Sequence, residues 1–276
     1  RFYADGLASP GTDITFFDWP VLRERRGTRS IARTGFRVAT EASLAYWASR
    51  LADQHITAAP IATVDGRPTL AFDDPEGQRL ALVVDTATSP AHPWERSPVP
   101  AEHQIRGLGP ITLSIPELAG TAAVLTGLMN MTEVRPYPAT ASTDGTATPA
   151  EVHVFEMARD TGPAAELHVA IEPHLSPARG GAGGVHHVAF RTPTFEQYDA
   201  WAERLREARV PFSGPVDRFY FRSLYFREPH GILFEIATDG PGFAADEPLE
   251  QLGEHLSLPP FLEAQRAEIE ARLKPV

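Results

Sequence analysis

The chain has 276 residues, of which 42% are hydrophobic and 22% charged, and its formal net charge is −11. These values describe a globular protein of one or two domains with enough apolar material for a core, and they exclude a disordered chain. The excess of 36 acidic over 25 basic residues argues against nucleic acid or an anionic membrane as the main partner. The lack of cysteine excludes disulfides, cysteine-ligated zinc and a thiol nucleophile, and it agrees with a cytoplasmic location.

A β-α-β-β-β unit is predicted from residue 30 onward. Residues 30–39 are expected to form a strand, and residues 41–54 an amphipathic helix with Leu44, Trp47 and Leu51 on one face. Three further strands, separated by Asp-Gly and Glu-Gly turns, are predicted over residues 57–63, 67–72 and 79–85.

The same unit recurs near the C-terminus. A shift of 154 residues, the distance from Trp47 to Trp201, also places the turn at residues 228–231 on the turn at residues 74–77, without a gap. Both turns read acid-Pro-x-Gly. An ungapped match of this length with a shared turn indicates duplication.

A third copy lies between these two, because half of that shift places Pro193 on Pro116. Residues 1–19, with a strand expected over residues 12–18, resemble the last two strands of a first copy whose opening strand and helix are absent from the given sequence. The expected fold is α+β, built from tandem β-α-β-β-β modules in two domains. These are an N-terminal domain over residues 1–88, a linker over 89–106, a C-terminal domain with the candidate metal site over 107–258, and a C-terminal helix over 259–276.

Glu235 is the most unusual residue of the last copy, because it is an acidic residue inside the apolar run 232–237. A carboxylate in such a run costs several kcal/mol unless it is paired or bound to a metal. In the same copy His187 lies next to His186 on a strand predicted over residues 185–191, which sends His186 to the opposite face or to a place beside the ligands. A histidine and a carboxylate on neighbouring strands are compatible with two arms of a metal site.

The repeat supplies an internal control for both residues. In the second copy Arg33 occupies the position of His187, and Ala81 occupies that of Glu235, so the unit folds without either. Two histidines and one carboxylate form the facial triad of non-haem iron oxygenases, and the repeat places the missing second histidine on the opening strand of the first copy. Structural roles remain open for both residues, as a hydrogen-bonded histidine and as a glutamate paired with a buried arginine.

Arg218 and Tyr225 are predicted to lie on the strands just before Glu235, in the aromatic and arginine-rich segment 217–226. In a concave site such residues hold a flat aromatic anion by stacking and charge. A half-buried strand with a solvated arginine face explains the segment equally well. The glycine-rich segment 180–184 precedes a strand rather than a helix, so it is predicted to be a flexible linker and not a phosphate loop.

The repeated units, the sequence Val-His-His-Val-Ala-Phe from residue 185 and the sequence Phe-Glu-Ile-Ala-Thr-Asp-Gly-Pro-Gly-Phe from residue 234 resemble the vicinal oxygen chelate (glyoxalase/bleomycin resistance/extradiol dioxygenase) superfamily. Within it the whole chain is similar to ring-cleaving dioxygenases of the hydroquinone 1,2-dioxygenase type. The resemblance implies glyoxalase-like domains with open mixed-sheet barrels. It also implies an Fe(II) or Mn(II) site with His187 and Glu235 as ligands and a histidine of the absent segment as the third. His186 would then be an acid/base next to the metal, and Arg218 and Tyr225 would reach the substrate.

The leading hypothesis is therefore metal-dependent cleavage of a hydroquinone-type ring by O2. One alternative is a glyoxalase-like isomerase or lyase that consumes no O2. Another is a non-catalytic protein that binds a small aromatic ligand in the same pocket; the absent first histidine favours it, and the unpaired Glu235 argues against it. The expected partners are a small aromatic substrate and O2, without nucleic acid or membrane, and a homo-oligomer is compatible with the sequence.

Overall fold

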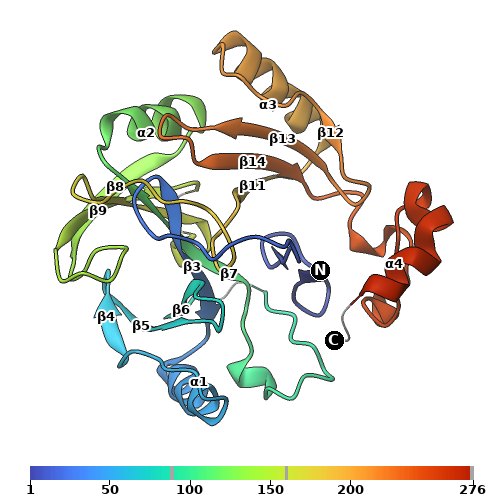
Figure 1. Ribbon diagram of the computed structural model, residues 1–276, viewed down its shortest axis with the longest axis horizontal. Coiled ribbons are helices and arrows are strands. Elements are labelled where there is room, and N and C mark those ends of the chain that lie inside the picture. The colour runs from blue at the N-terminus through green and yellow to red at the C-terminus, as the bar shows by residue number, and fades with distance from the viewer. Residues whose placement is uncertain (88–89, 159–160, 274–276) are drawn as a thin grey trace.

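The computed structural model describes residues 1–87, 90–158 and 161–273. At the N-terminus two short strands, β1 (Phe2–Tyr3) and β2 (Ile14–Thr15), pair antiparallel. Three β-α-β-β-β units follow them, as the repeat predicts (Figure 1). Few residues are helical, and the fold is of the mixed α+β class with curled, open sheets. None of the described helices is both long and apolar enough to cross a membrane.

The second copy comprises one long strand, a capped helix and three strands. The side chain of Thr40 accepts a hydrogen bond from the Ser43 amide, which satisfies one of the free N–H groups at the start of the helix. The elements are β3 (Ser30–Val38), α1 (Glu41–Asp53), β4 (Ala62–Val64), β5 (Arg67–Asp73) and β6 (Arg79–Val84).

The third and fourth copies repeat this order. The third consists of β7 (Leu108–Ile115), α2 (Ala119–Ala123) with a π-helical turn (Val124–Leu128), β8 (Thr132–Ala139), β9 (Ala150–Glu156) and β10 (Glu166–Ile171). The fourth consists of β11 (Val188–Thr192), α3 (Phe195–Glu207), β12 (Val216–Asp217), β13 (Arg222–Arg227) and β14 (Leu233–Thr238). After it, a 3₁₀ segment (Pro260–Gln265) leads into α4 (Arg266–Arg272), and the last three residues of the expected C-terminal helix lie outside the described residues.

The second and third copies share one sheet. Its eight strands follow the order β4-β5-β6-β3-β7-β10-β9-β8, and β3 and β7, the first strands of their copies, pair antiparallel at its centre. The fourth copy forms its own sheet in the order β11-β14-β13-β12. In Figure 1 this smaller sheet lies above the larger one, α3 covers its outer face, and the N-terminal segment runs below it.

Two apolar clusters hold these layers together. The larger cluster joins the third and fourth copies through buried side chains such as Leu113, Phe155, Phe190 and Phe234. The smaller cluster packs α1 on the part of the eight-stranded sheet that β3, β5 and β6 form. Full burial of each large apolar side chain contributes about 1.5–3 kcal/mol, so these clusters account for the packing of helix on sheet.

The strand register agrees with the shifts of 154 and 77 residues deduced from the sequence. In each copy the first and last strands pair in parallel, and one cross-strand pair occupies the same place in all three. These pairs are Ala189 with Glu235, Gly35 with Ala81, and Thr112 with His168. The residue of the third copy that corresponds to Glu235 is therefore His168.

Several predicted elements were wrong in extent. Only residues 14–15 of the strand expected over residues 12–18 form a strand, and in place of that expected over 57–63 there is β4 over residues 62–64, with an isolated bridge at Ala58 before it. The glycine-rich segment is not a free linker, because a Cβ at Gly181 would lie 2.1 Å from the carbonyl oxygen of Leu22. This close packing against the N-terminal segment includes a bridge between Arg23 and Ala182.

The histidine pair also lies outside its predicted strand. Strand β11 begins at Val188, so His186 and His187 precede it. The reason is that isolated bridges at residues 177, 179 and 182 hold the preceding chain against residues 23–28 rather than along β14.

Candidate metal centre

The two faces of the four-stranded sheet differ in chemistry. Phe190, Leu224 and Phe234 point to one face and are buried in the larger apolar cluster. On the other face Glu235 pairs directly with Tyr225 of β13 and with Ala189 of β11. Side chains two residues apart in extended chain share a face, which accounts for His187 lying on the same side as Glu235.

Glu235 is 3% exposed and fully hydrogen-bonded. The Nε2 atom of His187 lies 2.7 Å from Oε2 of Glu235, and the hydroxyl of Tyr225 donates to Oε1 at 2.8 Å. The hydroxyl of Ser223 donates to the same oxygen. Burial by itself would raise the pKa of Glu235, but the hydrogen bonds from His187, Ser223 and Tyr225 outweigh it and hold the pKa below its usual range. The carboxyl group is therefore ionised at neutral pH.

Two further contacts extend this arrangement at both ends. The Nε atom of Arg218 donates to the Tyr225 hydroxyl at 3.2 Å, and its guanidinium lies 5.2 Å from the centre of that ring. At the other end the Nδ1 atoms of His186 and His187 are 2.9 Å apart. The five residues selected from the sequence therefore form one continuous chain of contacts.

One detail differs from the sequence prediction: Arg218 follows β12 in a loop instead of lying on a strand. His186 is exposed and contacts His187, so of the two places considered for it, it takes the one beside the proposed ligands and not the one on the opposite face. Partial desolvation of the His186 ring, and then its proximity to His187, lower the pKa of His186, which favours the neutral form of its ring.

Sequence reasoning missed an aromatic pair beside these histidines. The ring of Phe17 lies 5.9 Å from that of His186 and 6.5 Å from that of His187, between centroids. Trp19 lies 5.4 Å from His186. The cluster Phe-Phe-Asp-Trp after β2 was a visible signal, but nothing local indicates that it meets a segment about 170 residues further along the chain.

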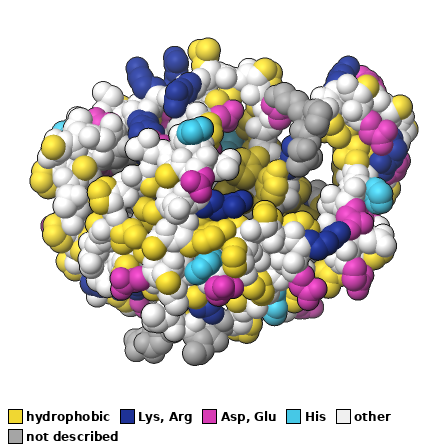
Figure 2. Space-filling view, turned by 90° about the horizontal axis from the view of Figure 1, so that it is seen from below, with side chains coloured by type: hydrophobic (Ala, Val, Ile, Leu, Met, Phe, Trp, Pro, Cys, Tyr) yellow, Lys and Arg dark blue, Asp and Glu magenta, His cyan; other side chains and the backbone are white. Residues whose placement is uncertain are grey.

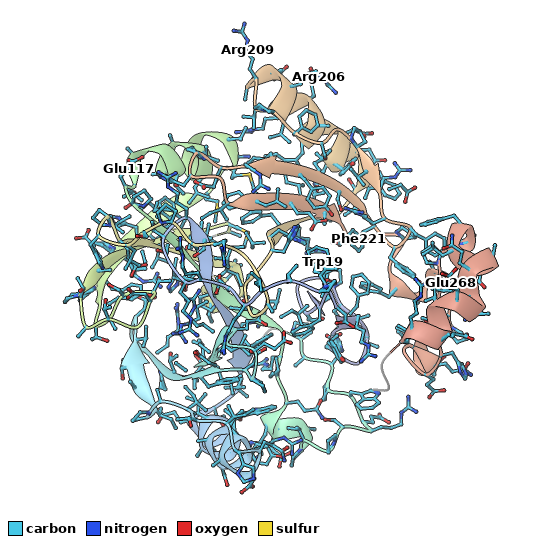
Figure 3. The ribbon with its side chains drawn as sticks, viewed as in Figure 1. Trp19, Glu117, Arg206, Arg209, Phe221 and Glu268 are labelled. Atoms are coloured by element: carbon cyan, nitrogen blue, oxygen red, sulfur yellow. The ribbon has the colours of Figure 1, made fainter. Side chains whose placement is uncertain are left out.

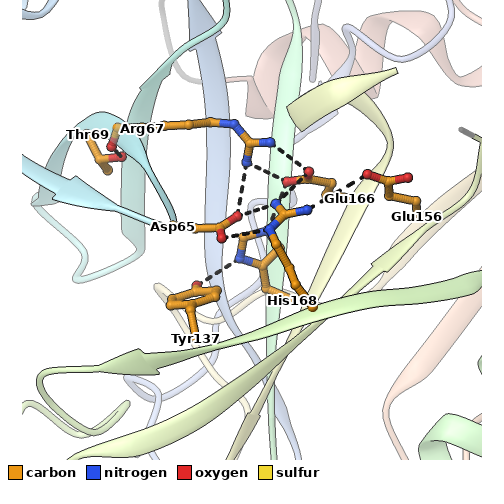
Figure 4. A network of polar contacts seen from close by, with 8 residues as sticks. Asp65, Arg67, Thr69, Tyr137, Glu156, Glu166 and His168 are labelled. Carbon is orange, nitrogen blue, oxygen red and sulfur yellow. Dashed lines mark hydrogen bonds and ion pairs between the residues drawn. The ribbon is translucent and has the colours of Figure 1, made fainter. Parts of the chain in front are cut away.

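A second group of metal-ligating side chains lies in the larger sheet. Asp65, Glu166 and His168 bring ligand atoms within 4.8 Å of one another, the one such group of three among the described residues. Arg67 donates to both oxygens of Glu166 at 2.7 and 2.8 Å, and Arg135 donates to Glu166 at 2.9 Å (Figure 4). Two guanidinium groups already neutralise these carboxylates and would repel a metal cation, so this donor set does not fit a metal.

Comparison with known proteins assigns the family. The model of the Glyoxalase/Bleomycin resistance protein/Dioxygenase superfamily matches residues 107–236. The chain is 43% identical to MhqA of Bacillus subtilis, which carries the provisional name of a ring-cleaving dioxygenase, over 100% of this chain and 85% of MhqA. It is 27% identical to the chlorohydroquinone/hydroquinone 1,2-dioxygenase of Sphingobium indicum, over 97% of this chain and 81% of that protein.

A solved structure agrees with this assignment. The crystal structure of a provisionally named dioxygenase from Bacillus subtilis matches with a TM-score of 0.85 at 30% identity, over 99% of this chain and 83% of that one. That match supports the whole described architecture, including the tandem copies. The chain belongs to the Glyoxalase/Bleomycin resistance protein/Dioxygenase superfamily.

Proposed function

We propose that the protein is a metal-dependent ring-cleaving dioxygenase that acts with O2 on hydroquinone-type aromatic diols. The observation that carries this proposal is the buried, ionised Glu235 joined to His187 on a sheet face that aromatic residues and Arg218 border. The fold does not require this pair, since Arg33 and Ala81 occupy the same positions in the second copy. The relatives named for ring cleavage support the same reaction class.

The donors fit a redox-active divalent metal. An imidazole nitrogen of His187 and a carboxylate oxygen of Glu235 are two of the three ligands in a 2-His-1-carboxylate site, which suits Fe(II) and also Mn(II). For the third ligand we propose a histidine on a strand that pairs with the second edge of β11. Within the described residues β11 pairs with β14 alone, whereas β3 and β7 pair with each other.

The surrounding residues orient these ligands and handle protons. When bound, the metal supplies electron transfer between the aromatic ring and O2. Tyr225 and Ser223 fix the orientation of Glu235, as hydrogen-bonded partners of metal ligands commonly do. The positive charge of Arg218 offsets negative charge on a deprotonated ring hydroxyl, and His186 provides a nitrogen that accepts its proton.

The remaining expectations concern partners and location. We expect one small aromatic substrate and O2 as reactants, and neither nucleic acid nor an anionic membrane as partner, because the net charge is −11. A cytoplasmic location and a homo-oligomer stay predictions of the sequence. Sedimentation analysis of the purified chain tests the second.

Oxygen uptake tests the proposed function. Fe(II)-loaded protein should consume one O2 for each chlorohydroquinone and give an acyclic product that contains both labelled atoms when ¹⁸O₂ is supplied. Conversion without O2 uptake would assign the protein to the isomerases or lyases of the superfamily. Tight binding without conversion, by metal-loaded protein, would support a non-catalytic binding protein instead.

A further inference from the structure

We propose that Phe17 forms the wall against which the aromatic ring of the substrate stacks, and that Trp19 holds the Phe17 ring in place. This inference rests on the proposed function, because it assigns residues to the substrate of that site. It also deepens that function, since it names the residues that recognise the aromatic ring of the substrate.

The position of Phe17 supports the first part. The ring of His187, the proposed ligand, is near two aromatic rings that come from distant parts of the chain. Phe17 approaches from the N-terminal segment at 6.5 Å, and Tyr225 approaches from β13 at 5.9 Å. Phe17 is therefore a wall, contributed from outside the four-stranded sheet, that a ring held beside His187 can meet.

The packing of Trp19 supports the second part. Its ring is stacked on that of Phe17 with centroids 4.4 Å apart and an angle of 17° between the planes. In Figure 3 Trp19 lies below β11 and β14, on the side of the sheet away from α3. The stack limits rotation of Phe17, so a substrate ring meets a preformed surface and loses less entropy on binding.

The exposure of this pair is high for such large apolar side chains. Phe17 is 47% and Trp19 51% exposed, and both lie beside the histidine pair. Figure 2 shows apolar side chains gathered around a hollow on one face of the molecule, with basic and histidine side chains near its margin. Exposed apolar surface next to converging polar groups is typical of a ligand-binding site.

Phe16 provides a matched control. It is adjacent in the chain and 44% exposed, but its ring contacts Tyr3 at 5.7 Å, with no ring contact to either histidine of the site. Phe16→Leu therefore makes the same chemical change as Phe17→Leu, at a side chain of similar exposure that makes no ring contact with the histidine pair. Any effect of Phe17→Leu that Phe16→Leu lacks belongs to the site and not to the segment.

The experiment measures anaerobic binding of chlorohydroquinone by calorimetry, and steady-state oxygen uptake, on the full Fe(II)-loaded chain. Phe17→Leu should raise both Kd and KM by about 3- to 10-fold, the value of a lost aromatic contact, and leave kcat within about twofold. Phe16→Leu should match the wild type. Trp19→Leu should raise Kd by about 2- to 3-fold, and Trp19→Phe, which keeps a stacked ring, should restore wild-type binding.

The outcomes separate this inference from the proposed function. If the wild type consumes O2 and Phe17→Leu binds like Phe16→Leu, the wall assignment is overturned and the dioxygenase stands. If the wild type consumes no O2 but Phe17→Leu still weakens anaerobic binding, the wall stands and the dioxygenase fails. If Phe17→Leu does not fold by circular dichroism, Phe17→Met replaces it and must meet the same expectation.

Discussion

The large and the small sheet each bury a glutamate on the face that bears polar side chains, but the two glutamates have different partners. In the large sheet Glu166 accepts hydrogen bonds from Arg67 and Arg135. In the small sheet Glu235 accepts them from His187, Tyr225 and Ser223. A guanidinium is permanently charged and saturates the first carboxylate, whereas an imidazole, which is itself a common metal ligand, lies beside the second.

The geometry explains what the first arrangement does. Asp65 lies in the turn between β4 and β5, at one end of the eight-stranded sheet, and its Oδ1 accepts from Nε of Arg135 on β8 at 2.8 Å. Strands β4 and β8 are the two ends of the strand order, so the ion pairs tie the curled sheet across its concave side. The same concave place that holds a candidate metal in the small sheet is therefore filled by salt bridges in the large one.

The largest expected effect follows from Glu235→Gln. The amide keeps the shape of the side chain but removes the charge that the metal requires, so turnover of chlorohydroquinone should fall by at least about 100-fold. Oxygen uptake by Fe(II)-loaded protein measures this. Glu166→Gln, the matched substitution in the other sheet, should leave kcat within about twofold; equal losses for both variants would contradict the comparison.

Although Glu166→Gln should hardly affect turnover, we expect it to lower the stability of the folded protein. Glu166→Gln leaves two arginines without their shared carboxylate, so the free energy of unfolding should fall by about 2–3 kcal/mol. This estimate is near the low end for buried pairs, because the side chains of Arg67 and Arg135 are 22% and 33% exposed and water screens part of the charge. Urea denaturation measures the change, and an unchanged midpoint would show that the network does not stabilise the sheet.

The stability difference between wild type and Glu166→Gln should depend on pH, which tests whether Glu166 is ionised in the folded protein. Burial by itself would raise the pKa of Glu166, but hydrogen bonds from His168, Arg67 and Arg135 hold it well below its ordinary value of 4.5. As pH falls, the unfolded chain takes up this proton first. The stabilisation by Glu166 is therefore complete above pH 4.5 and is lost as pH falls through the lower native pKa. The stability gap between wild type and Glu166→Gln should shrink from about pH 5 to pH 3 in urea titrations, and a constant gap would argue against an ionised native Glu166.

A smaller effect is expected from Tyr225→Phe. This variant keeps the ring against His187 but removes the hydroxyl that donates to Glu235 and accepts from Arg218. Because partners of ligands orient them without supplying the metal bond, kcat should fall by about tenfold while metal content stays unchanged. Rapid kinetics with metal analysis tests this, and loss of the metal would make Tyr225 a determinant of metal binding.

The sequence predicted the repeat and singled out five residues that the structure brings into contact, because both leave local or periodic signals. Trp47 and Trp201 establish the shift between copies. Glu235 is conspicuous because it is an acidic residue in the otherwise apolar run 232–237. The contact of Phe17 with the histidine pair could not be predicted, since it joins the N-terminal segment to the last copy. The network around Glu166 was missed for the same reason: its charges lie on separate strands and meet only when the sheet curls.

Metal content tests the central claim most directly. Wild type, Glu235→Gln and Glu166→Gln would be loaded anaerobically with Fe(II), desalted and analysed by atomic emission. We expect about one iron per chain in the wild type and in Glu166→Gln, and almost none in Glu235→Gln, because the carboxylate supplies one of the few protein ligands. Iron retained by Glu235→Gln, or lost from folded Glu166→Gln, would contradict the assignment of the metal centre to the small sheet.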